Sequence, residues 1–321
     1  MNTRAICFTL LSIIAISMAA SLPAQAQRAR VFVSVNGNDA NPCTGGSPCK
    51  TFQHAHDVVL LGGEISVIDT GGYGTLTITK ALSIVNPNGV EAAIATSSGQ
   101  SAITINAGPS DVISLRGLTL DGTGVGQDGI VFNSGGALEV TDCVARGYID
   151  SGLRIQPSAA ATFKVTNSEF NDNATQGIVV VPNGVAQVTG VIDRAGLYNN
   201  FIGLNLVGIN STGGTISFTA KDSTASNNTN NPPSNGAGFA VQASTGQAVT
   251  HLMLVKSVAA NNFYGLFVSG VNAKAFVNDS TITRNANGWI ASSSGVIATY
   301  GSNAVDDNTS NESAESPATL K

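Results

Sequence analysis

The chain contains 321 residues, and its 15 lysines and arginines against 20 aspartates and glutamates give a formal net charge of −5. Charged residues make up only 11% of the chain, against about 25% in typical soluble proteins. Nucleic acids are bound by basic stripes, which this charge balance does not supply, so we expect no nucleic-acid partner. We expect a surface dominated by Thr, Ser, Asn and Gly, which would favour binding of uncharged polymers or an inert structural role.

Residues 1–26 are predicted to be a secretory signal peptide. Arg4 supplies the positive start, residues 5–20 form an apolar core, and the small-x-small motif at 24–26 is a cleavage site. An uncleaved membrane anchor is the alternative, but the polar and small residues of this segment favour removal. No other segment is long and apolar enough to span a bilayer. The mature chain, from Gln27 onward, is therefore expected to be secreted, into the periplasm or the extracellular space.

Two cysteines lie close together in the first part of the mature chain. Cys43 and Cys49 are six residues apart in a loop rich in Gly and Pro, and in an oxidising compartment they would form a disulfide. A metal-binding pair is the less favoured alternative, because that loop contains no histidine and no further cysteine. Cys143 falls in a column of serines in later repeats, so we expect a small buried thiol and not a nucleophile.

Seven glycines, 23 to 35 residues apart, each open a short run of alternating apolar residues. The first and third residues after each glycine are apolar, and this spacing of two places both on one face of a strand, toward a buried core. Recurrence at a period near 25 residues predicts a solenoid of stacked coils. The glycines are Gly129, Gly152, Gly177, Gly203, Gly238, Gly265 and Gly288.

A second unit recurs upstream of each glycine and usually contains an aspartate or asparagine. These residues enter the left-handed backbone region most readily after glycine, so we expect a tight bend there on every coil. Six residues later comes a column of mostly asparagines, which could form an amide ladder at a coil spacing of about 4.8 Å. The bend column holds Asp142, Asn167, Asp193, Asp222, Lys256 and Asp279. The ladder column holds Tyr148, Asn173, Asn199, Asn228, Asn262 and Asn285.

This coil, with a bend after its first strand and a glycine before its third, resembles the right-handed parallel β-helix of the pectate-lyase-like superfamily. The resemblance implies an all-β, right-handed parallel β-helix solenoid over residues 27–304. It also implies an initial strand and an N-terminal helical cap within residues 27–63, with a helix at Thr51–Leu61 covering the apolar end of the stack. Residues 305–321 lack the period and are expected to be a disordered tail.

In enzymes of that superfamily the substrate usually lies along the sheet of the glycine-led strands. Hydrolase members place paired aspartates there for acid and base catalysis, and lyase members hold calcium with acidic side chains beside an arginine or lysine base. The fourteen outward positions at the second and fourth residues after each glycine contain no Asp or Glu. The hydrolase pattern is therefore missing from these positions, and any lyase pattern is displaced.

Displaced candidates lie in the loops that lead into the glycine-led strands. Asp128, Asp150 and Asp172 lie on adjacent coils and could hold calcium through oxygen ligands, the only cofactor that the sequence suggests. Asp128 and Asp150 are also candidate catalytic residues together with Arg154, which could act as a base or grip a substrate carboxylate. The alternative is that these aspartates only cap turns.

Polar residues on the outward face form a candidate ligand-binding set. Asn205 and Gln242 lie below an insertion at 227–236, and Arg154 and Gln156 lie further along the same face; loops beside such strands often determine specificity. The sequence thus favours an exported, non-catalytic module that binds a polysaccharide or a surface. The alternatives are a calcium-dependent polysaccharide lyase or glycoside hydrolase of the pectate-lyase-like type, and a purely structural or adhesin-like protein.

Overall fold

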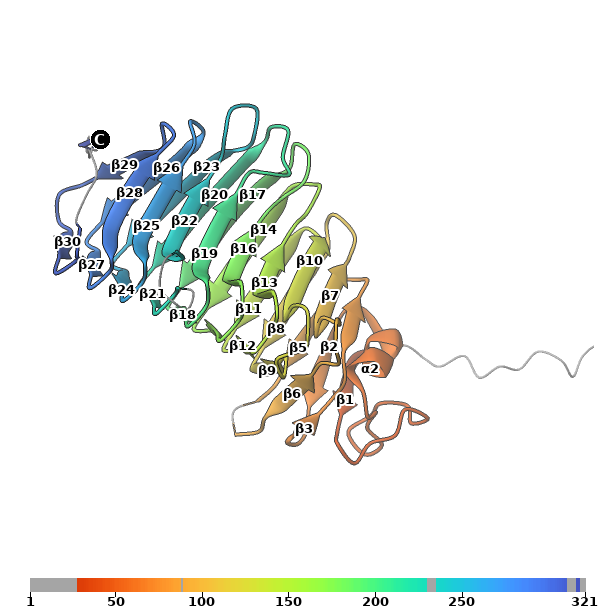
Figure 1. Ribbon diagram of the computed structural model, residues 1–321. Coiled ribbons are helices and arrows are strands. Elements are labelled where there is room, and N and C mark those ends of the chain that lie inside the picture. The colour runs from red at the N-terminus through yellow and green to blue at the C-terminus, as the bar shows by residue number, and fades with distance from the viewer. Residues whose placement is uncertain (1–27, 88, 230–234, 311–315, 318–321) are drawn as a thin grey trace, which may run out of the picture.

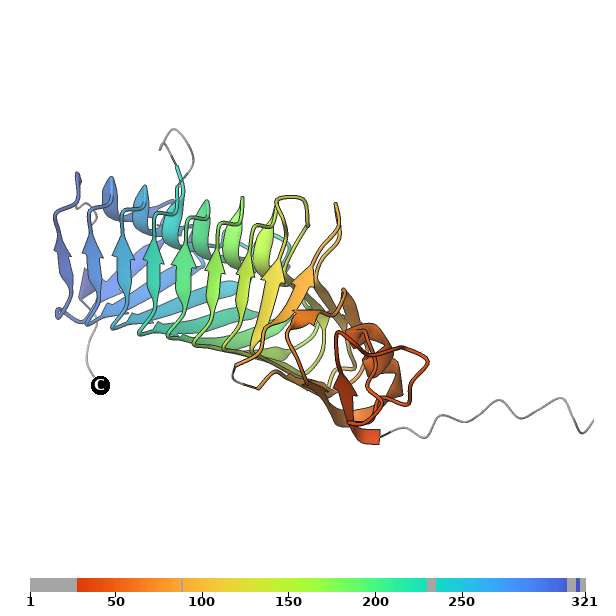
Figure 2. The same cartoon turned by 90° about the horizontal axis from the view of Figure 1, so that it is seen from below.

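The computed structural model describes residues 28–87, 89–229, 235–310 and 316–317. The signal peptide expected at 1–26 lies outside these residues. The described chain winds as a parallel β-solenoid whose coils stack along one axis (Figures 1 and 2). Each regular coil contributes one strand to each of three sheets, which contain twelve, nine and ten strands.

The twelve-stranded sheet runs the length of the solenoid. Its strands pair in parallel from coil to coil, as where Leu138 lies opposite Phe163. They are β1 (Arg28–Val33), β2 (Val59–Val67), β5 (Leu82–Val85), β8 (Val112–Arg116), β11 (Ala137–Thr141), β14 (Ala161–Thr166), β17 (Gln187–Asp193), β20 (Thr215–Lys221), β23 (Val249–Val255), β26 (Ala273–Asn278), β29 (Val296–Thr299) and β31 (Ser316–Pro317).

The nine-stranded sheet contains the glycine-led strands. Its parallel register places Ile130 opposite Leu153, and Leu153 opposite Ile178, so the repeat of the sequence is the repeat of the coil. Its strands are β4 (Leu76–Ile78), β7 (Ile103–Asn106), β10 (Ile130–Ser134), β13 (Ser151–Ile155), β16 (Gln176–Val180), β19 (Ile202–Val207), β22 (Ala237–Gln242), β25 (Tyr264–Ser269) and β28 (Asn287–Ser292).

The ten-stranded sheet consists of two- to four-residue strands that follow the bends. It completes an all-β parallel solenoid, as the sequence predicts. Its strands are β3 (Gly71–Gly72), β6 (Ala92–Ala95), β9 (Leu118–Asp121), β12 (Val144–Arg146), β15 (Glu169–Asn171), β18 (Gly196–Tyr198), β21 (Thr224–Ser226), β24 (Val258–Ala260), β27 (Thr281–Thr283) and β30 (Ala304–Asp306).

The helix of the described chain, α2 (Phe52–Val58), lies at the N-terminal end of the stack, against β1, β2 and β4 (Figure 1). The Thr51 hydroxyl accepts a hydrogen bond from the His54 amide at 3.2 Å and fixes the start of the helix. The helix predicted at Thr51–Leu61 is too long, because Val59 begins β2, which pairs with β1 and β5. One seven-residue helix does not establish a helical cap. Among the described residues, no helix has the length and apolar character of a membrane span.

The predicted inward columns are confirmed. Every residue of the first column, from Ile130 to Trp289, is at most 3% exposed. The third-column residues are buried as well, except the last, Ala291, which is partly buried against the core. A continuous apolar core therefore fills the solenoid, and its burial supplies the main driving force for folding.

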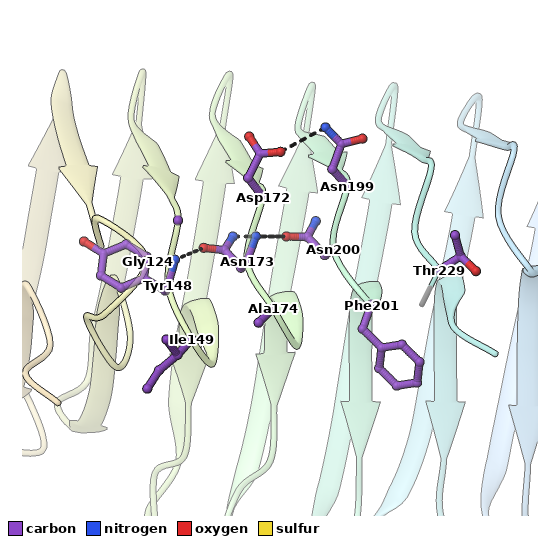
Figure 3. A pocket seen from close by; sticks show the side chains of 11 residues that line it. Gly124, Tyr148, Ile149, Asp172, Asn173, Ala174, Asn199, Asn200, Phe201 and Thr229 are labelled. Atoms are coloured by element: carbon purple, nitrogen blue, oxygen red, sulfur yellow. Dashed lines mark hydrogen bonds between the residues drawn. The ribbon is translucent and has the colours of Figure 1, made fainter. Parts of the chain in front are cut away.

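A ladder of buried asparagines runs along the core side of the coils (Figure 3). Asn173 donates through Nδ2 to Asn200 Oδ1 at 3.1 Å, and Asn200 donates in the same way to Asn228 at 3.2 Å. The repeating glycines make room for it: a Cβ at Gly177 would lie 2.7 Å from the Gly203 carbonyl oxygen and 3.0 Å from Asn200 Nδ2. The glycine and asparagine columns are thus two halves of one packing requirement.

The structure corrects one coil of the predicted register. The residue with positive φ at that bend is Arg194 (φ 52°), and Asp193 is the last residue of β17. Counting six residues onward places Asn200 in the ladder, while Asn199 lies outside it with φ 56° and donates to Asp172. The spacing from bend to ladder is constant, so the slip arose from choosing the aspartate over the arginine as the bend residue.

The last coil extends beyond the predicted boundary at residue 304. β30 pairs with β27, and Asn308 accepts a hydrogen bond from Asn285 Nδ2 at 2.9 Å, so residues up to Ser310 continue the solenoid. The predicted tail at 305–321 therefore begins too early. This coil lacks a following glycine-led strand in the sequence, which is why the repeat did not show it.

The Cys43–Cys49 disulfide is confirmed, and both cysteines are buried beside β1. Cys143 is a free, buried thiol. Burial raises its pKa to about 11, so the thiol stays protonated at neutral pH. This agrees with the structural role predicted for it.

Candidate functional site

The outer face of the nine-stranded sheet carries three parallel rows of side chains, one residue per coil. One row was overlooked in the sequence. It consists of the residue directly before each glycine, which also points outward. Before Gly129 this residue is Asp128, so the face carries a carboxylate although the fourteen positions counted in the sequence contain none. The overlooked row runs Asp128, Ser151, Gln176, Ile202, Ala237, Tyr264 and Asn287.

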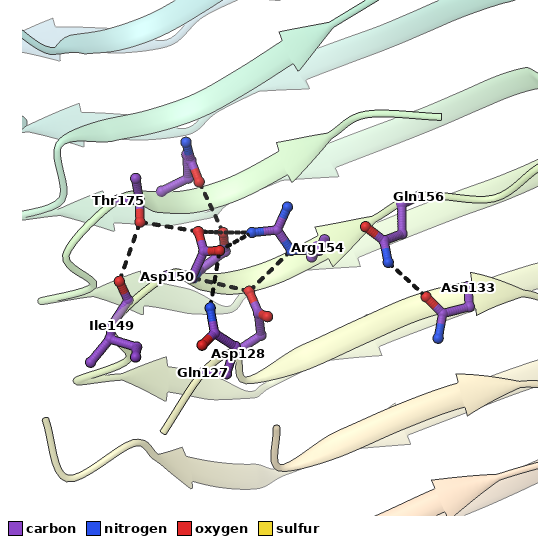
Figure 4. A network of polar contacts seen from close by, with 10 residues as sticks. Gln127, Asp128, Asn133, Ile149, Asp150, Arg154, Gln156 and Thr175 are labelled. Atoms are coloured by element: carbon purple, nitrogen blue, oxygen red, sulfur yellow. Dashed lines mark hydrogen bonds and ion pairs between the residues drawn. The ribbon is translucent and has the colours of Figure 1, made fainter. Parts of the chain in front are cut away.

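Asp128, Asp150 and Arg154 form one cluster on this face (Figure 4). Arg154 lies on β13 and donates through Nε to Asp128 Oδ1 at 3.2 Å, while its Nη2 contacts Asp150 Oδ2. The Asp128 side chain is only 5% exposed and that of Arg154 20%. The structure thus brings together the three residues that the sequence proposed as catalytic candidates, with the guanidinium between the two carboxylates.

Neighbouring polar groups hold Asp150 in place. Its Oδ1 accepts hydrogen bonds from the hydroxyls of Ser151 and Thr175 at 3.1 and 3.0 Å, and its Oδ2 accepts one from Gln127 Nε2 at 3.3 Å. Asp128 Oδ1 also accepts from the Ser151 amide at 3.1 Å. Both carboxylates are therefore oriented by hydrogen-bond donors from neighbouring coils: Ser151 for both, and Gln127 and Thr175 for Asp150.

The two carboxylates occupy unequal environments. Burial raises the pKa of Asp128 above its ordinary value; Arg154 opposes this rise and the charge of Asp150 adds to it. Asp150 is more exposed, at 26% of its side chain. A carboxyl group that holds its proton more firmly than usual therefore lies beside a second carboxyl group with better access to solvent.

Asp172 does not join this cluster. It lies at a bend with φ 56°, is exposed, and accepts a hydrogen bond from Asn199 Nδ2 at 3.0 Å in a separate polar pocket of about 330 Å³ (Figure 3). The calcium site predicted from three converging aspartates is therefore not formed, and the guanidinium of Arg154 already pairs with the other two. Within the described ranges, the group of three side chains that could hold a metal comprises Cys43, Cys49 and His54, and its cysteines are joined in the disulfide.

Side-chain amides continue along the same face. Gln156 donates to Asn133 at 2.8 Å (Figure 4), and Asn133 donates to Asn106 at 2.9 Å. Further along, Gln242 donates to Asn205 at 2.9 Å. The predicted ligand-binding residues Asn205 and Gln242 thus meet. Gln156 and Arg154 do not contact each other: Gln156 donates to Asn133, and Arg154 pairs with Asp128 and Asp150.

A groove of about 370 Å³ lies beside the Asn205–Gln242 pair, over β19, β22 and β25. The rings of Tyr264 and Phe267 form one side, with centroids 5.2 Å apart and planes tilted by 30°. The floor is apolar and buried: Ile202, Ala237 and Ala240 are at most 9% exposed. Asn235 and Gly236, from the predicted insertion at 227–236, line the groove, and residues 230–234 of that insertion lie outside the described residues.

Sequence reasoning missed this aromatic groove. Phe267, the second residue after Gly265, was among the fourteen outward positions counted in the sequence, but Tyr264 lies in the overlooked row before the glycine. A count of outward positions on both sides of each glycine would have revealed both Tyr264 and Asp128.

No protein-family model matches the chain, and no curated protein sequence is similar enough to count as a match. Among solved structures, the chain is similar to pectate lyase Pel9A, with a TM-score of 0.57 and 17% identity over 88% of this chain and 80% of that one. It is similar to the A-module of the Azotobacter vinelandii mannuronan C-5 epimerase AlgE4, with a TM-score of 0.52 and 15% identity over 81% of this chain and 91% of that one. For the ORF18 protein of Geobacillus virus E2 the TM-score is 0.52 and the identity 11%, over 95% of this chain and 63% of that one.

At these identities the likeness concerns the fold and not the chemistry. The pectate lyase and the epimerase match over most of their own lengths as well as most of this chain. Their similarity therefore extends over most of the chain and is not confined to a few local coils. Together with the three parallel sheets, it shows that this chain has the fold of the pectate-lyase-like parallel β-helix proteins.

Proposed function

We propose that the protein binds a polysaccharide along the outer face of the nine-stranded sheet. The observation that carries the proposal is the groove in which the rings of Tyr264 and Phe267 lie beside the amide of Gln242. Sugar rings have apolar C–H faces and rims of hydroxyl groups, so they bind where aromatic rings adjoin hydrogen-bonding groups. This groove offers both on neighbouring coils.

The repeat of the sheet suits a repeating ligand. Equivalent outward positions recur every coil, about 4.8 Å apart, which is close to the length of one pyranose unit in an extended chain. Asn133, Gln156 and Gln242 present partly exposed amides along this direction, and the largely buried Asn205 accepts the hydrogen bond of Gln242. Each amide has more donor and acceptor positions than its one or two side-chain hydrogen bonds use, so hydroxyl groups can be accommodated on several coils in turn.

Export belongs to the same proposal. We infer a signal peptide at 1–26 and a secreted right-handed β-helix domain from residue 27 to the last coil, with α2 covering its N-terminal end. The Cys43–Cys49 disulfide supports an oxidising compartment. The names of two similar structures, a pectate lyase and a mannuronan epimerase, support a polysaccharide as the ligand.

A second candidate function is cleavage of the bound polysaccharide at the Asp128, Asp150 and Arg154 cluster. The observation that favours it is the raised pKa of Asp128 beside a more exposed carboxylate. Two carboxyl groups in unequal environments can take separate acid and base roles: Asp128 would donate its proton to the leaving oxygen, and Asp150 would act as the base. A lyase with an arginine base would require Arg154 to leave both carboxylates.

Binding is tested by calorimetric titration of the mature protein with a panel of polysaccharides. We expect saturable binding to at least one of them, weakened by Asn205→Ala combined with Gln242→Ala while the circular dichroism spectrum is unchanged. Undiminished binding by this double variant would contradict the groove assignment. Absence of saturable binding throughout the panel would leave a structural or adhesin-like role.

Cleavage is tested by digesting the same panel with and without calcium and identifying products by mass spectrometry. Saturated oligosaccharides that disappear with Asp150→Asn would establish hydrolysis at the cluster. Unsaturated products formed only with calcium would instead establish a lyase and return attention to Arg154. No products at all would leave binding as the function.

A further inference from the structure

Charged groups are sparse on the proposed binding face and do not favour an anionic ligand. In the outer rows from β7 to β28, the charged residues are Asp128 and Arg154. The turns that follow β10 to β28 contain none. The turns that lead into β10 to β28 add Asp150, Asp172 and Arg284, so that carboxylates outnumber guanidinium groups by three to two.

Both arginines, Arg154 on the face and Arg284 in a turn beside it, are already engaged by carboxylates. Arg154 contacts Asp128 and Asp150 at once, and its side chain is only 20% exposed. Arg284 lies 3.6 Å from Asp307 at the far bend. Capture of a sugar carboxylate by Arg154 would require it to give up two partners and to leave a buried aspartate unpaired, which is costly.

The aromatic groove, by contrast, combines apolar surface with uncharged polar groups. Tyr264, Phe267 and the apolar floor offer ring and aliphatic surface, and Gln242 and Asn235 offer amides. Amides both donate and accept hydrogen bonds, which matches hydroxyl groups, whereas a carboxylate is best held by cations. The described lining of this groove contains no charged side chain.

From this charge distribution we infer that the ligand is a polysaccharide of uncharged sugars and that the Asp128–Asp150 pair disfavours polyuronates. The inference rests on the proposed binding function and narrows its ligand class. The inferred ligand class differs from the polymers in the names of two similar structures, since pectate and mannuronan are polyanions. The fold is shared, but the electrostatics of the binding face differ from what a polyanion needs.

The first test compares the affinity of the mature protein for uncharged polysaccharides, such as galactans, glucans and mannans, with that for pectate and alginate. We expect binding to an uncharged polymer that changes little between low and high salt, since no ion pair forms. Tighter binding to a polyuronate would overturn the inference and leave the binding function standing. Absence of binding to either class of polysaccharide would contradict both the inferred ligand class and the proposed binding function.

The second test alters the charge of the cluster. Asp150→Asn keeps a side chain that can hydrogen-bond Thr175 and Gln127 but releases one partner of Arg154. We expect its affinity for pectate at low salt to rise by about tenfold, because a repelling charge is removed and the guanidinium is partly freed.

The matched control is Asp172→Asn, which removes the same charge at an exposed bend outside the cluster, where asparagine also tolerates positive φ. It should leave the affinity for pectate within about twofold of the parent, since exposed charges at a distance are screened. Equal gains in the two variants, or no gain in Asp150→Asn, would overturn the role assigned to the acidic pair. Melting temperatures of both variants confirm that each compared protein is folded.

Discussion

The buried asparagine ladder offers a sharp prediction for Asn228→Ala. Asn228 is completely buried. Its Oδ1 accepts from the amide and the Nδ2 of Asn200 at 3.1 and 3.2 Å, and its Nδ2 donates to the Leu197 carbonyl at 2.9 Å and to Asn262 Oδ1 at 3.0 Å. The substitution therefore removes four hydrogen bonds in the interior of the solenoid.

The magnitude follows from the groups left behind. The amide proton of Asn200 loses its acceptor in a site that water does not reach, and a buried polar group without its partner costs about 1–3 kcal/mol. The lost side-chain bonds and the small cavity left by truncation add to this. We expect Asn228→Ala to lower the free energy of unfolding by about 3–5 kcal/mol.

The matched control is Asn133→Ala, the same substitution in the solvent-facing amide row. Asn133 makes two side-chain hydrogen bonds, to Asn106 and from Gln156, but water can replace both. We expect a loss of about 1 kcal/mol or less. Urea denaturation followed by circular dichroism measures both variants. Equal losses, or an Asn228→Ala midpoint at the parent value, would refute the reasoning that the ladder holds the coils together.

Three further predictions concern the core, the disulfide and the acidic pair. Val180→Asp would place an unpaired carboxylate at a position that is 0% exposed and should destabilise by about 4 kcal/mol; thermal melting at the parent temperature would mean that the in–out register is wrong. Replacing both Cys43 and Cys49 by serine should cost about 2 kcal/mol, because the cross-link closes a short loop, and an unchanged urea midpoint would contradict this. Burial raises the pKa of Asp128 above its ordinary value of 3.8. The contribution of Asp128 to the free energy of unfolding is therefore largest below pH 3.8 and is lost as the pH rises through the raised pKa. Asp128→Asn cannot titrate, and its stability relative to the parent should therefore increase over this range; a difference independent of pH would speak against a buried, proton-retaining carboxyl group.

The fold could be predicted because its determinants are local and repeated. Each coil repeats three features: a left-handed bend, an asparagine six residues after the bend, and a glycine whose missing side chain leaves room for the backbone of the next coil. Together these features specify the coil. The register slipped at Arg194 because an arginine at a bend gives no compositional signal, although its backbone adopts the same conformation as the aspartates. Residues 305–310 were missed since the final coil has no glycine-led strand to complete the repeat.

The site was predicted only in part, because it depends on which residues face one another across coils. Asp128, Asp150 and Arg154 were recognised and do converge, but their mutual pairing followed from distances that the sequence does not contain. Asp172 was grouped with them by its proximity to the next glycine, yet the bend turns it toward Asn199. Tyr264 was overlooked because the residue before the glycine was not counted as part of the strand.

The most direct test of polysaccharide binding on the nine-stranded sheet compares two aromatic substitutions. Tyr264→Ala removes a ring from the groove, and Phe276→Ala removes a half-buried ring from the twelve-stranded sheet, where it packs against His251. Calorimetric titration with the tightest-binding uncharged polysaccharide should show a loss of about tenfold or more in affinity for Tyr264→Ala. Phe276→Ala should bind like the parent. If the two variants bind equally well, the nine-stranded face is not the binding surface.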